Sequence, residues 1–396
     1  MATLVAVPAA AVDGQGEGLR VPAPIIGEYD NPAGKPDEVL PLSLANQEGC
    51  IDSDDGTMSC IEEIPPGSIA EGEGDRPLAG VTAPAWCADA INKIQGTRQE
   101  ICWVKGLDYT TYRRVNGVRE ITGNAKMNVL SYSYSSLTMP TFAYQIETSV
   151  YNAWGDTMKA SISGSSAASG ACKLDESTFK PQKIAPLNSW KLGESYYTTT
   201  ATEEDAIGKC QTTWNLTLTN PGYTTAKSSH TLNEFRCDNA AGGNPRSVGC
   251  VVPWFPSAMV YSKAAAPELA SHITRAQKSG LPGATVTAPL THTTSTTVYE
   301  KNRSLACPTK ETRPAGKSCD EYPLASTLQG LAITGGERRT FTDCNILGVP
   351  ARTGVKGVSA CMISVEDQRY QGGVTSKFYQ RQRVLNGDPF RVRIGN

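Results

Sequence analysis

Between residues 83 and 258, apolar and polar residues alternate along the chain. The alternation is clearest over residues 142–148 and again over residues 214–218, and the second run ends before a Pro221-Gly222 turn. Because successive side chains of a strand point to opposite faces, a period of two predicts β-strands. Ser and Thr are frequent there and no helical period is present, so we predict a β-rich, sandwich-like domain over residues 83–258.

A helical pattern follows at residues 264–280. Pro267 suits the first helical position, apolar residues recur at helical spacing, and Gly280 suits the position after the last turn. We therefore predict a helical connector over residues 259–299. His272 lies beside the apolar stripe, where a lone histidine is more often a packed or surface residue than a ligand.

Residues 300–396 are predicted to form a second, smaller domain that mixes helix and strand. Gly372-Gly373 is expected to open a short helix over residues 374–381. A hairpin is expected over residues 383–394, because an Asn386-Gly387 turn there precedes an alternating run. The apolar residues of that run would enter a core, and two arginines would face solvent, Arg391 and Arg393.

Charge divides the chain into an acidic and a basic part. The 396 residues carry a formal net charge of −2, but residues 21–80 hold 13 acidic and 2 basic side chains. The last 96 residues hold 15 Lys and Arg against 8 Asp and Glu. Because it is rich in Gly, Pro and Glu, segment 12–82 is predicted to be an acidic, mostly disordered arm. Two interpretations fit: the arm masks a basic polyanion-binding body, or it is a solvated segment beside an ordinary basic surface.

The N-terminus and the cysteines indicate an exported protein. Residues 1–11 form a short apolar stretch ending in small residues, which is typical of a signal-peptide remnant, and a flexible terminus is the alternative. Twelve cysteines without a C-x-x-C pair, and only 3 histidines, favour disulfides over zinc. No apolar run is long enough to span a membrane. The simplest pairing joins neighbours along the chain: Cys50–Cys60, Cys87–Cys102, Cys172–Cys210, Cys237–Cys250, Cys307–Cys319 and Cys344–Cys361.

One short segment indicates chemistry. Asp320 and Glu321 stand between Cys319 and Tyr322-Pro323, in a locally basic neighbourhood. Carboxylates held near apolar groups and cations usually serve metal or proton chemistry. Neighbouring residues of a strand point to opposite faces, so the two acids are not expected to reach one metal ion together. One would then act while the other anchors a supporting network.

The segment Ser318-Cys319-Asp320-Glu321-Tyr322-Pro323-Leu324-Ala325-Ser326-Thr327 resembles the signature of the secreted NucA/NucB-type deoxyribonucleases, in their actinobacterial form. Residues 366–373 and 386–390 fit the same family, and the likeness covers about residues 300–396. A weaker likeness extends upstream to two further motifs, Arg236-Cys237-Asp238 and Gly249-Cys250-Val251.

The resemblance implies metal-dependent cleavage of DNA, without sequence preference, by a small domain related to the ββα-metal nucleases. It implies that Asp320 and Glu321 are catalytic, with the aspartate as general base. Asp367 and Gln368 would hold a divalent metal ion, for which Mg, Mn or Ca suits oxygen ligands. The substrate DNA would be bound by a phosphate-binding arginine, by two glycines opening a helix and by two further cations: Arg369, Gly372, Gly373, Lys377 and Arg381.

Three positions depart from the family pattern. The family commonly has an aromatic residue where Leu324 stands, an acid near Gln329 and Asn where Gln368 stands. Two functions therefore stay open. The first is a secreted, metal-dependent, sequence-nonspecific endodeoxyribonuclease. The alternative is a disulfide-stabilised extracellular binding or surface protein whose nuclease domain is degenerate and non-catalytic.

Overall fold

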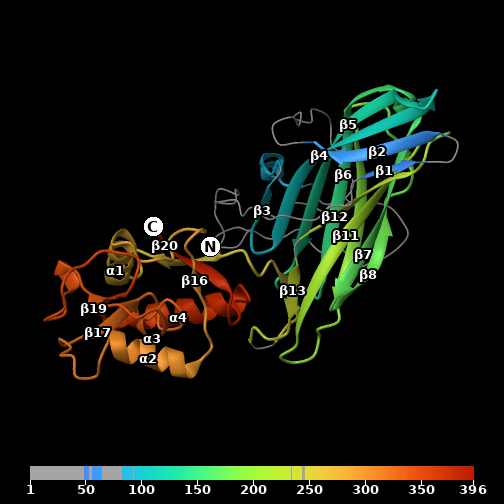
Figure 1. Ribbon diagram of the computed structural model, residues 1–396. Coiled ribbons are helices and arrows are strands. Elements are labelled where there is room, and N and C mark those ends of the chain that lie inside the picture. The colour runs from blue at the N-terminus through green and yellow to red at the C-terminus, as the bar shows by residue number, and fades with distance from the viewer. Residues whose placement is uncertain (1–48, 53–55, 65–82, 92, 233, 243–245) are drawn as a thin grey trace.

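The computed structural model describes residues 49–52, 56–64, 83–91, 93–232, 234–242 and 246–396. The predicted signal-peptide remnant and most of the predicted acidic arm lie outside these residues. A β-rich unit is followed by a smaller C-terminal unit of mixed helix and strand, and the two units lie side by side (Figure 1). None of the helices in the described part of the chain has the length and hydrophobicity that crossing a bilayer requires.

The β-rich unit contains two antiparallel sheets. The larger sheet has the order β1–β2–β4–β5–β6–β10–β8 with β3 beside β4, and its strands are Gly49–Asp52 (β1), Thr57–Glu63 (β2), Ile94–Gly96 (β3), Glu100–Val115 (β4), Val118–Ser135 (β5), Thr141–Gly155 (β6), Cys172–Thr178 (β8) and Trp190–Thr199 (β10). The smaller sheet has the order β14–β13–β11–β7–β9 with β12 beside β11, and its strands are Ser161–Gly170 (β7), Gln182–Lys183 (β9), Ile207–Thr219 (β11), Ala226–Thr231 (β12), Phe235–Asp238 (β13) and Gly249–Val251 (β14). Two 3₁₀ turns interrupt the strands, Ala85–Asp89 (η1) and Asp156–Lys159 (η2).

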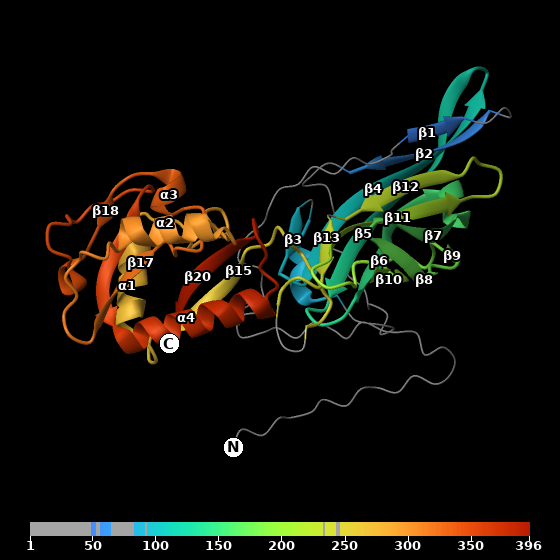
Figure 2. The ribbon, with the colours of Figure 1, turned by 90° about the horizontal axis from the view of Figure 1, so that it is seen from below.

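The two sheets share one hydrophobic core. Tyr144 of β6 and Trp214 of β11 meet edge to face in it, with ring centroids 6.4 Å apart. The opposite face of β6 is also covered, because Ala143 packs with Trp86 of η1 in a second cluster. This explains why β6 is buried on both faces although its sequence alternates. The predicted β-rich architecture is confirmed as two curled, facing sheets (Figure 2).

The β-rich unit begins earlier than the sequence indicates. Residues 49–52 and 57–63 form a hairpin that adds β1 and β2 to the larger sheet, with Cys60 facing Cys50 across the pair. The prediction of a mostly disordered arm over residues 12–82 is therefore wrong for this hairpin. Its acidic composition hid a short strand, in which Met58, Cys60 and Ile61 are buried.

Five of the six predicted cysteine pairs are disulfides: Cys50–Cys60, Cys87–Cys102, Cys237–Cys250, Cys307–Cys319 and Cys344–Cys361. The prediction that all twelve cysteines are bonded is wrong for the sixth pair. Cys172 and Cys210 are free thiols. They are nevertheless neighbours, because Cys172 begins β8 and Cys210 of β11 pairs with Gly170 of β7, and the two thiols are hydrogen-bonded to each other.

The C-terminal unit has two three-stranded sheets. One contains Ser257–Ser262 (β15), Leu290–Thr291 (β16) and Pro389–Gly395 (β20), in the order β15–β20–β16. The other contains Lys317–Tyr322 (β17), Arg338–Arg339 (β18) and Val358–Ser364 (β19), in the order β17–β19–β18. The helices are Pro267–Lys278 (α1), Thr296–Ala306 (α2), Leu331–Thr334 (α3) and Val365–Arg381 (α4), with a 3₁₀ turn at Thr342–Cys344 (η3).

The predicted helical connector is part of this unit. The helix forms at Pro267–Lys278, with Pro267 in its first turn and Gly280 at a φ of +99° just after it. Its apolar stripe packs in the core of the C-terminal unit, together with Tyr322 and Phe378. β15 pairs in parallel with β20, the last strand of the chain. Residues from about 257 onward therefore fold with the C-terminal unit and do not merely join it to the β-rich unit.

Two predictions for the C-terminus are wrong. α4 begins at Val365, where the Ser364 hydroxyl accepts a hydrogen bond from the Asp367 amide at 3.0 Å, and not after Gly372-Gly373. No hairpin forms over residues 383–394, since β20 pairs with β15 and β16. Arg391 is buried rather than solvent-facing, and its Nε donates to the Pro256 carbonyl at 2.9 Å.

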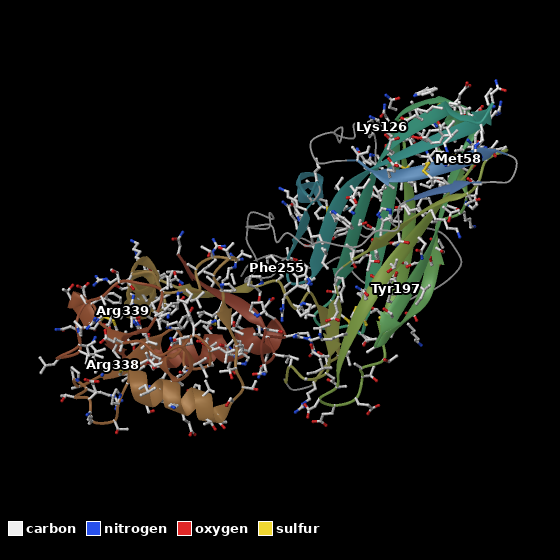
Figure 3. The ribbon with its side chains drawn as sticks, viewed as in Figure 1. Met58, Lys126, Tyr197, Phe255, Arg338 and Arg339 are labelled. Carbon is white, nitrogen blue, oxygen red and sulfur yellow. A yellow bond between two sulfur atoms is a disulfide. The ribbon has the colours of Figure 1, made fainter. Side chains whose placement is uncertain are left out.

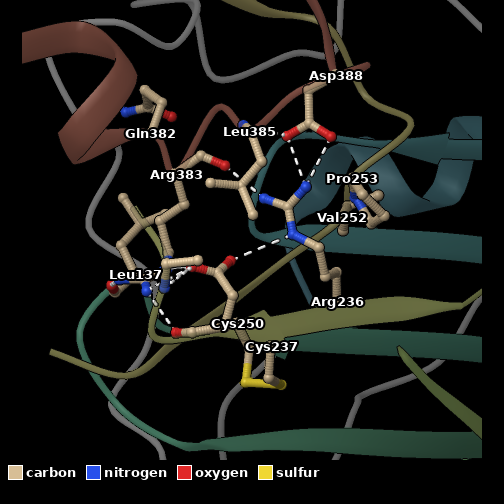
Figure 4. Close-up of polar contacts among 12 residues, drawn as sticks. Leu137, Arg236, Cys237, Cys250, Val252, Pro253, Gln382, Arg383, Leu385 and Asp388 are labelled. Atoms are coloured by element: carbon tan, nitrogen blue, oxygen red, sulfur yellow. Dashed lines mark hydrogen bonds and ion pairs between the residues drawn. A yellow bond between two sulfur atoms is a disulfide. The ribbon is translucent and has the colours of Figure 1, made fainter. Parts of the chain in front are cut away.

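A buried charge network joins the two units (Figure 4). Asp388 of the C-terminal unit accepts from Arg98 at 2.5 Å and from Arg236 at 2.6 and 2.7 Å. Arg383, which has a φ of +50°, reaches in the other direction and contacts Asp238 at 2.7 Å. Phe255 lies at the same junction (Figure 3). Two motifs that share the family likeness, Arg236-Cys237-Asp238 and residues 386–390, are thus in direct contact.

Candidate functional site

Strand β17 carries the predicted catalytic pair, and its two acids face opposite sides, as the strand alternation predicts. Asp320 faces α1: its Oδ2 lies 2.6 Å from Nδ1 of His272. The other ring nitrogen of His272, Nε2, lies 2.8 Å from the hydroxyl of Ser359 on β19. Asp320 and His272 are each 1% exposed and Ser359 is fully buried. The three side chains therefore form a chain of hydrogen bonds inside the protein.

The proton positions in this chain follow from its ends. The Ser359 hydroxyl donates to the Tyr322 carbonyl at 3.2 Å, so it receives a hydrogen bond from Nε2 of His272. Nδ1 of His272 shares the remaining hydrogen bond with Oδ2 of Asp320. This oxygen of Asp320 therefore already has a partner. As arranged, Asp320 is held by His272 and is shielded from solvent.

Glu321 faces the other side of β17, toward α2. Burial raises the pKa of Glu321 to about 8, and the neighbouring Asp320 carboxylate adds to the increase. The Arg303 guanidinium and the Ala325 backbone N–H act in the opposite direction. A carboxyl group with this pKa exchanges its proton near neutral pH, which is the property that acid–base catalysis requires.

A buried amide fixes the loop that follows Glu321. Asn302 of α2 donates to the carbonyls of Ala325 and Thr327, each at 2.9 Å, and accepts from the Ala332 amide at 2.8 Å. The side chain fits tightly, since a Cβ on Gly330 would lie 2.3 Å from it. Asn302 thus positions the Ala325 N–H that contacts Glu321, and the next residue of α2 is Arg303.

Asp367, a predicted metal ligand, caps α1 instead. Its Oδ2 accepts from the backbone N–H groups of Glu268 and Leu269, each at 2.9 Å, and its Oδ1 accepts from the Ser364 hydroxyl at 2.7 Å. A carboxylate at a helix N-terminus satisfies otherwise unpaired N–H groups and favours the helix dipole. Asp367 therefore connects α4 to the first turn of α1, one helical turn before His272.

Gln368, the other predicted metal ligand, contacts the neighbouring turn of α4. Its Nε2 donates to Oε1 of Gln371 at 2.7 Å, and its own Oε1 is buried without a partner among the described residues. Exchanging the oxygen and nitrogen of both amides would only move the unpaired oxygen to Gln371. One amide oxygen is unpaired in either arrangement, and such an oxygen is available to a hydrogen-bond donor or a cation.

The predicted DNA-binding residues line the exposed side of α4. Arg369, Gly373, Lys377 and Arg381 follow at intervals of four residues and are exposed, as is Gly372. Residues spaced by four lie on one helix face, over about 18 Å for twelve residues. The glycines lie inside the helix, so their N–H groups serve helical bonds and do not open a phosphate site. They leave a gap between the cations, with no atom within 4 Å of a Cβ built on either glycine.

The structure therefore does not bring all the predicted site residues together. α2 and α4 lie on opposite sides of β17 and β20 (Figure 2). Glu321 belongs to the α2 side, whereas Asp367, Gln368 and the cations belong to α4. Asp320 lies between the two, toward α1.

The fit of a divalent metal ion follows from these contacts. Asp320 is paired with His272, both Asp367 oxygens accept hydrogen bonds, and the raised pKa of Glu321 keeps it protonated at neutral pH. Within the described ranges, no three His, Cys, Asp or Glu side chains are grouped to hold a metal ion. As arranged, Asp367 does not fit the ion, and the single unpaired amide oxygen at Gln368 or Gln371 does not make a site by itself.

Sequence reasoning missed His272, Asn302 and Arg303. In the sequence, His272 is a polar residue beside an apolar helical stripe. The sequence around it does not indicate that its partner is Asp320, 48 residues further along the chain. Asn302 and Arg303 belong to an Asn-x-Ser sequence, which is a glycosylation signal only on an exposed asparagine. Asn302 is 2% exposed, so its role is structural.

Comparisons with known proteins add one finding. Neither the curated proteins nor the solved structures gave a match. The family models gave one: residues 290–393 match Deoxyribonuclease NucA/NucB, so the C-terminal unit carries a domain of the family that the sequence motifs resemble.

Proposed function

We propose that the C-terminal unit hydrolyses the phosphodiester bonds of DNA outside the cell, with Glu321 as the group that exchanges a proton with the reacting water. The family match supports the activity. The observation that carries the role of Glu321 is its pKa of about 8, in a half-buried position beside Arg303.

The chemical step follows from this position. Ionised Glu321 accepts a proton from a water molecule while the water oxygen bonds to phosphorus. The bond from phosphorus to the leaving oxygen breaks, and that oxygen takes a proton from solvent. A carboxylate of raised pKa is a stronger base than an ordinary one, which favours this transfer. Arg303 is exposed beside it and can neutralise a phosphate oxygen.

Asp320 has a supporting role in this proposal. Its carboxylate raises the pKa of Glu321 through the shared strand, and His272 holds it in place. Glu321 is thus the acid that exchanges a proton, and Asp320 is the acid that anchors the supporting hydrogen-bond network. The cations of α4 would hold the DNA backbone without reading its sequence, through Arg369, Lys377 and Arg381.

A divalent metal ion is the cofactor that the family resemblance implies. Because the predicted ligands do not fit the ion as they are arranged, the proposed hydrolysis step is described through Glu321, Arg303 and water alone.

Export is supported by the five disulfides, which are characteristic of oxidising compartments. The alternative, a binding protein with an inactive nuclease domain, gains no support from the family match.

Plasmid nicking by the full chain between pH 6 and pH 10 tests the proposal, with EDTA, Mg, Mn and Ca as separate arms. The rate should rise with pH to a plateau, with a midpoint near the pKa of Glu321. Glu321→Gln should lower the plateau about 10²–10⁴-fold. Glu337→Gln, an exposed acid of the same unit that pairs with Arg352, is the matched control and should cut as wild type.

Asp320→Asn separates the two acids. Removing its charge should shift the midpoint of the pH–rate profile to lower pH, because one cause of the raised pKa of Glu321 is lost. If Glu321→Gln cuts like wild type while Asp320→Asn does not cut and remains folded, the two roles are reversed. If wild type never cuts in any arm, the binding alternative holds.

A further inference from the structure

Two free thiols lie side by side in the β-rich unit and take no part in the proposed hydrolysis. Cys172 is half-buried and Cys210 is fully buried, and both pack in the hydrophobic core between the two sheets. Cys210 donates a hydrogen bond to Cys172, and the Cys172 thiol donates to the Ser169 carbonyl at 3.5 Å. The pair therefore combines one thiol that solvent reaches with one that solvent does not.

The backbone that carries the two cysteines is held in place. Gly170 of β7 pairs with Cys210 of β11 and has a φ of +85°, and a Cβ on this glycine would lie 2.2 Å from the Lys209 carbonyl oxygen. The next amide, that of Ala171, donates to the same carbonyl at 2.7 Å. Cys172 follows directly and begins β8, so the bend from β7 into β8 keeps its side chain beside Cys210 (Figure 2).

The two thiols differ in reactivity. The hydrogen bond from Cys210 lowers the pKa of Cys172, although burial acts in the opposite direction. The same hydrogen bond raises the pKa of Cys210, and burial and the charge of Glu234, which pairs with Lys209, add to the increase. Burial raises the pKa of nearby Tyr197 to about 12, so this phenol stays neutral at physiological pH. Because the thiolate is the attacking species, Cys172 reacts first.

We propose that Cys172 is a site of thiol–disulfide exchange with a low-molecular-weight disulfide, and that Cys210 is its resolving thiol. The Cys172 thiolate bonds to one sulfur of the small disulfide, whose S–S bond breaks, and the first small thiol leaves with a proton from solvent. Cys210 then loses its proton to solvent and bonds to the Cys172 sulfur, and the second small thiol leaves, again protonated by solvent. The small disulfide is reduced, and the two cysteines are oxidised. The inference does not depend on the proposed nuclease.

Alkylation after exposure to glutathione disulfide tests the proposal on the folded full chain. The protein is incubated with glutathione disulfide, denatured without reduction, labelled with iodoacetamide and measured by mass spectrometry. Without glutathione disulfide, Cys172 and Cys210 should both be labelled. After the incubation, neither should be labelled and no glutathione should remain on the protein, because the resolving step releases it.

Two matched variants separate the roles of the thiols. Cys210→Ala lacks the resolving thiol, so it should keep one glutathione on Cys172. Cys172→Ala lacks the attacking thiol, and its remaining buried thiol should react about tenfold more slowly or less. Circular dichroism checks the fold of both variants. If Cys210→Ala does not fold, peptide mapping of wild type quenched early in the reaction should still find glutathione on Cys172 and not on Cys210.

A pH profile of alkylation reports the coupling between the thiols. In folded wild type, the labelling rate of Cys172 should have its midpoint below that of an unperturbed thiol. Cys210→Ala should move this midpoint upward, because the hydrogen bond is lost while burial remains. An unchanged midpoint would overturn the assigned roles, as would glutathione appearing first on Cys210. Two labelled thiols remaining in wild type after the incubation would overturn the proposal as a whole.

Discussion

Replacing Asp388 with asparagine would remove one of the two anions from the network that joins the units. Asp388 accepts four hydrogen bonds, three from Arg98 and Arg236 and one from the Leu385 amide at 3.0 Å. Asparagine has nearly the same size but presents an N–H₂ group toward these donors. The three buried guanidinium groups would then share one carboxylate, Asp238.

The magnitude of the effect follows from burial. Arg98 is fully buried and the Asp388 side chain is 9% exposed. Removing one partner of a buried ion pair costs about 3–5 kcal/mol, because the remaining charge stays desolvated. A typical domain is stable by about 5–15 kcal/mol, so the substitution should remove a large share of the free energy of unfolding. Burial raises the pKa of Asp388, but Arg98 and Arg236 outweigh it, so the pKa lies below its ordinary value.

Urea unfolding followed by tryptophan fluorescence measures the loss. At pH 7, Asp388→Asn should unfold at much lower urea than wild type. Because the folded pKa of Asp388 is depressed, its contribution is complete above the unfolded pKa and is lost as pH falls through the folded value. The two proteins should therefore converge in strong acid. Glu234→Gln is the control, since its pair with Lys209 is exposed and is worth about 0–1 kcal/mol. A loss at pH 7 no larger than that of the control would refute the reasoning.

Three further predictions concern titration, thiols and charge. The folded pKa of Glu321 is raised to about 8, so ionisation of this side chain opposes folding as the pH rises above its unfolded pKa. Glu321→Gln should therefore raise the melting temperature at pH 9 and leave it unchanged at pH 4. An equal change in melting temperature at both pH values would contradict the raised pKa. Iodoacetamide labelling of the denatured, unreduced protein, read by mass spectrometry, should modify two thiols, Cys172 and Cys210, and any other number would contradict the disulfide set. Deleting residues 1–48 should tighten DNA binding at low salt and less so at high salt, if the acidic arm competes for the basic surface; unchanged affinity in a titration at low salt would make the arm a spacer.

Local patterns predicted the parts of the fold that local physics determines. A period of two identified β6 and β11, and Pro267 and Gly280 marked the ends of α1 within a few residues. The C-terminal hairpin was wrong because an Asn-Gly pair indicates a turn but not the partner of the strand that follows. The partner is β15, about 130 residues earlier and parallel, and parallel pairing leaves no turn signal in the sequence.

The same limit applies to the candidate site. Alternation along β17 predicted that Asp320 and Glu321 would face apart, and they do. It could not predict what each acid meets, because His272 and Arg303 come from helices elsewhere in the chain. Likewise, Asp367 has the sequence context of a metal ligand, yet its Oδ2 accepts from the first turn of α1 and its Oδ1 accepts from Ser364.

These contacts change what must be purified to measure the activity. The matched range begins at residue 290, but β15 and α1 precede it. β15 pairs with β20, and α1 supplies the backbone N–H groups that donate to Asp367 and the histidine that holds Asp320. A fragment of residues 300–396 would lack both β15 and β16, so it would expose both edges of β20, and it would leave Asp320 without its partner. A fragment starting near residue 257 would keep these contacts but would still separate Arg383 and Asp388 from their partners Arg98, Arg236 and Asp238. The β-rich unit therefore contributes to the stability of the C-terminal unit, and the proposed activity is best measured with the full chain.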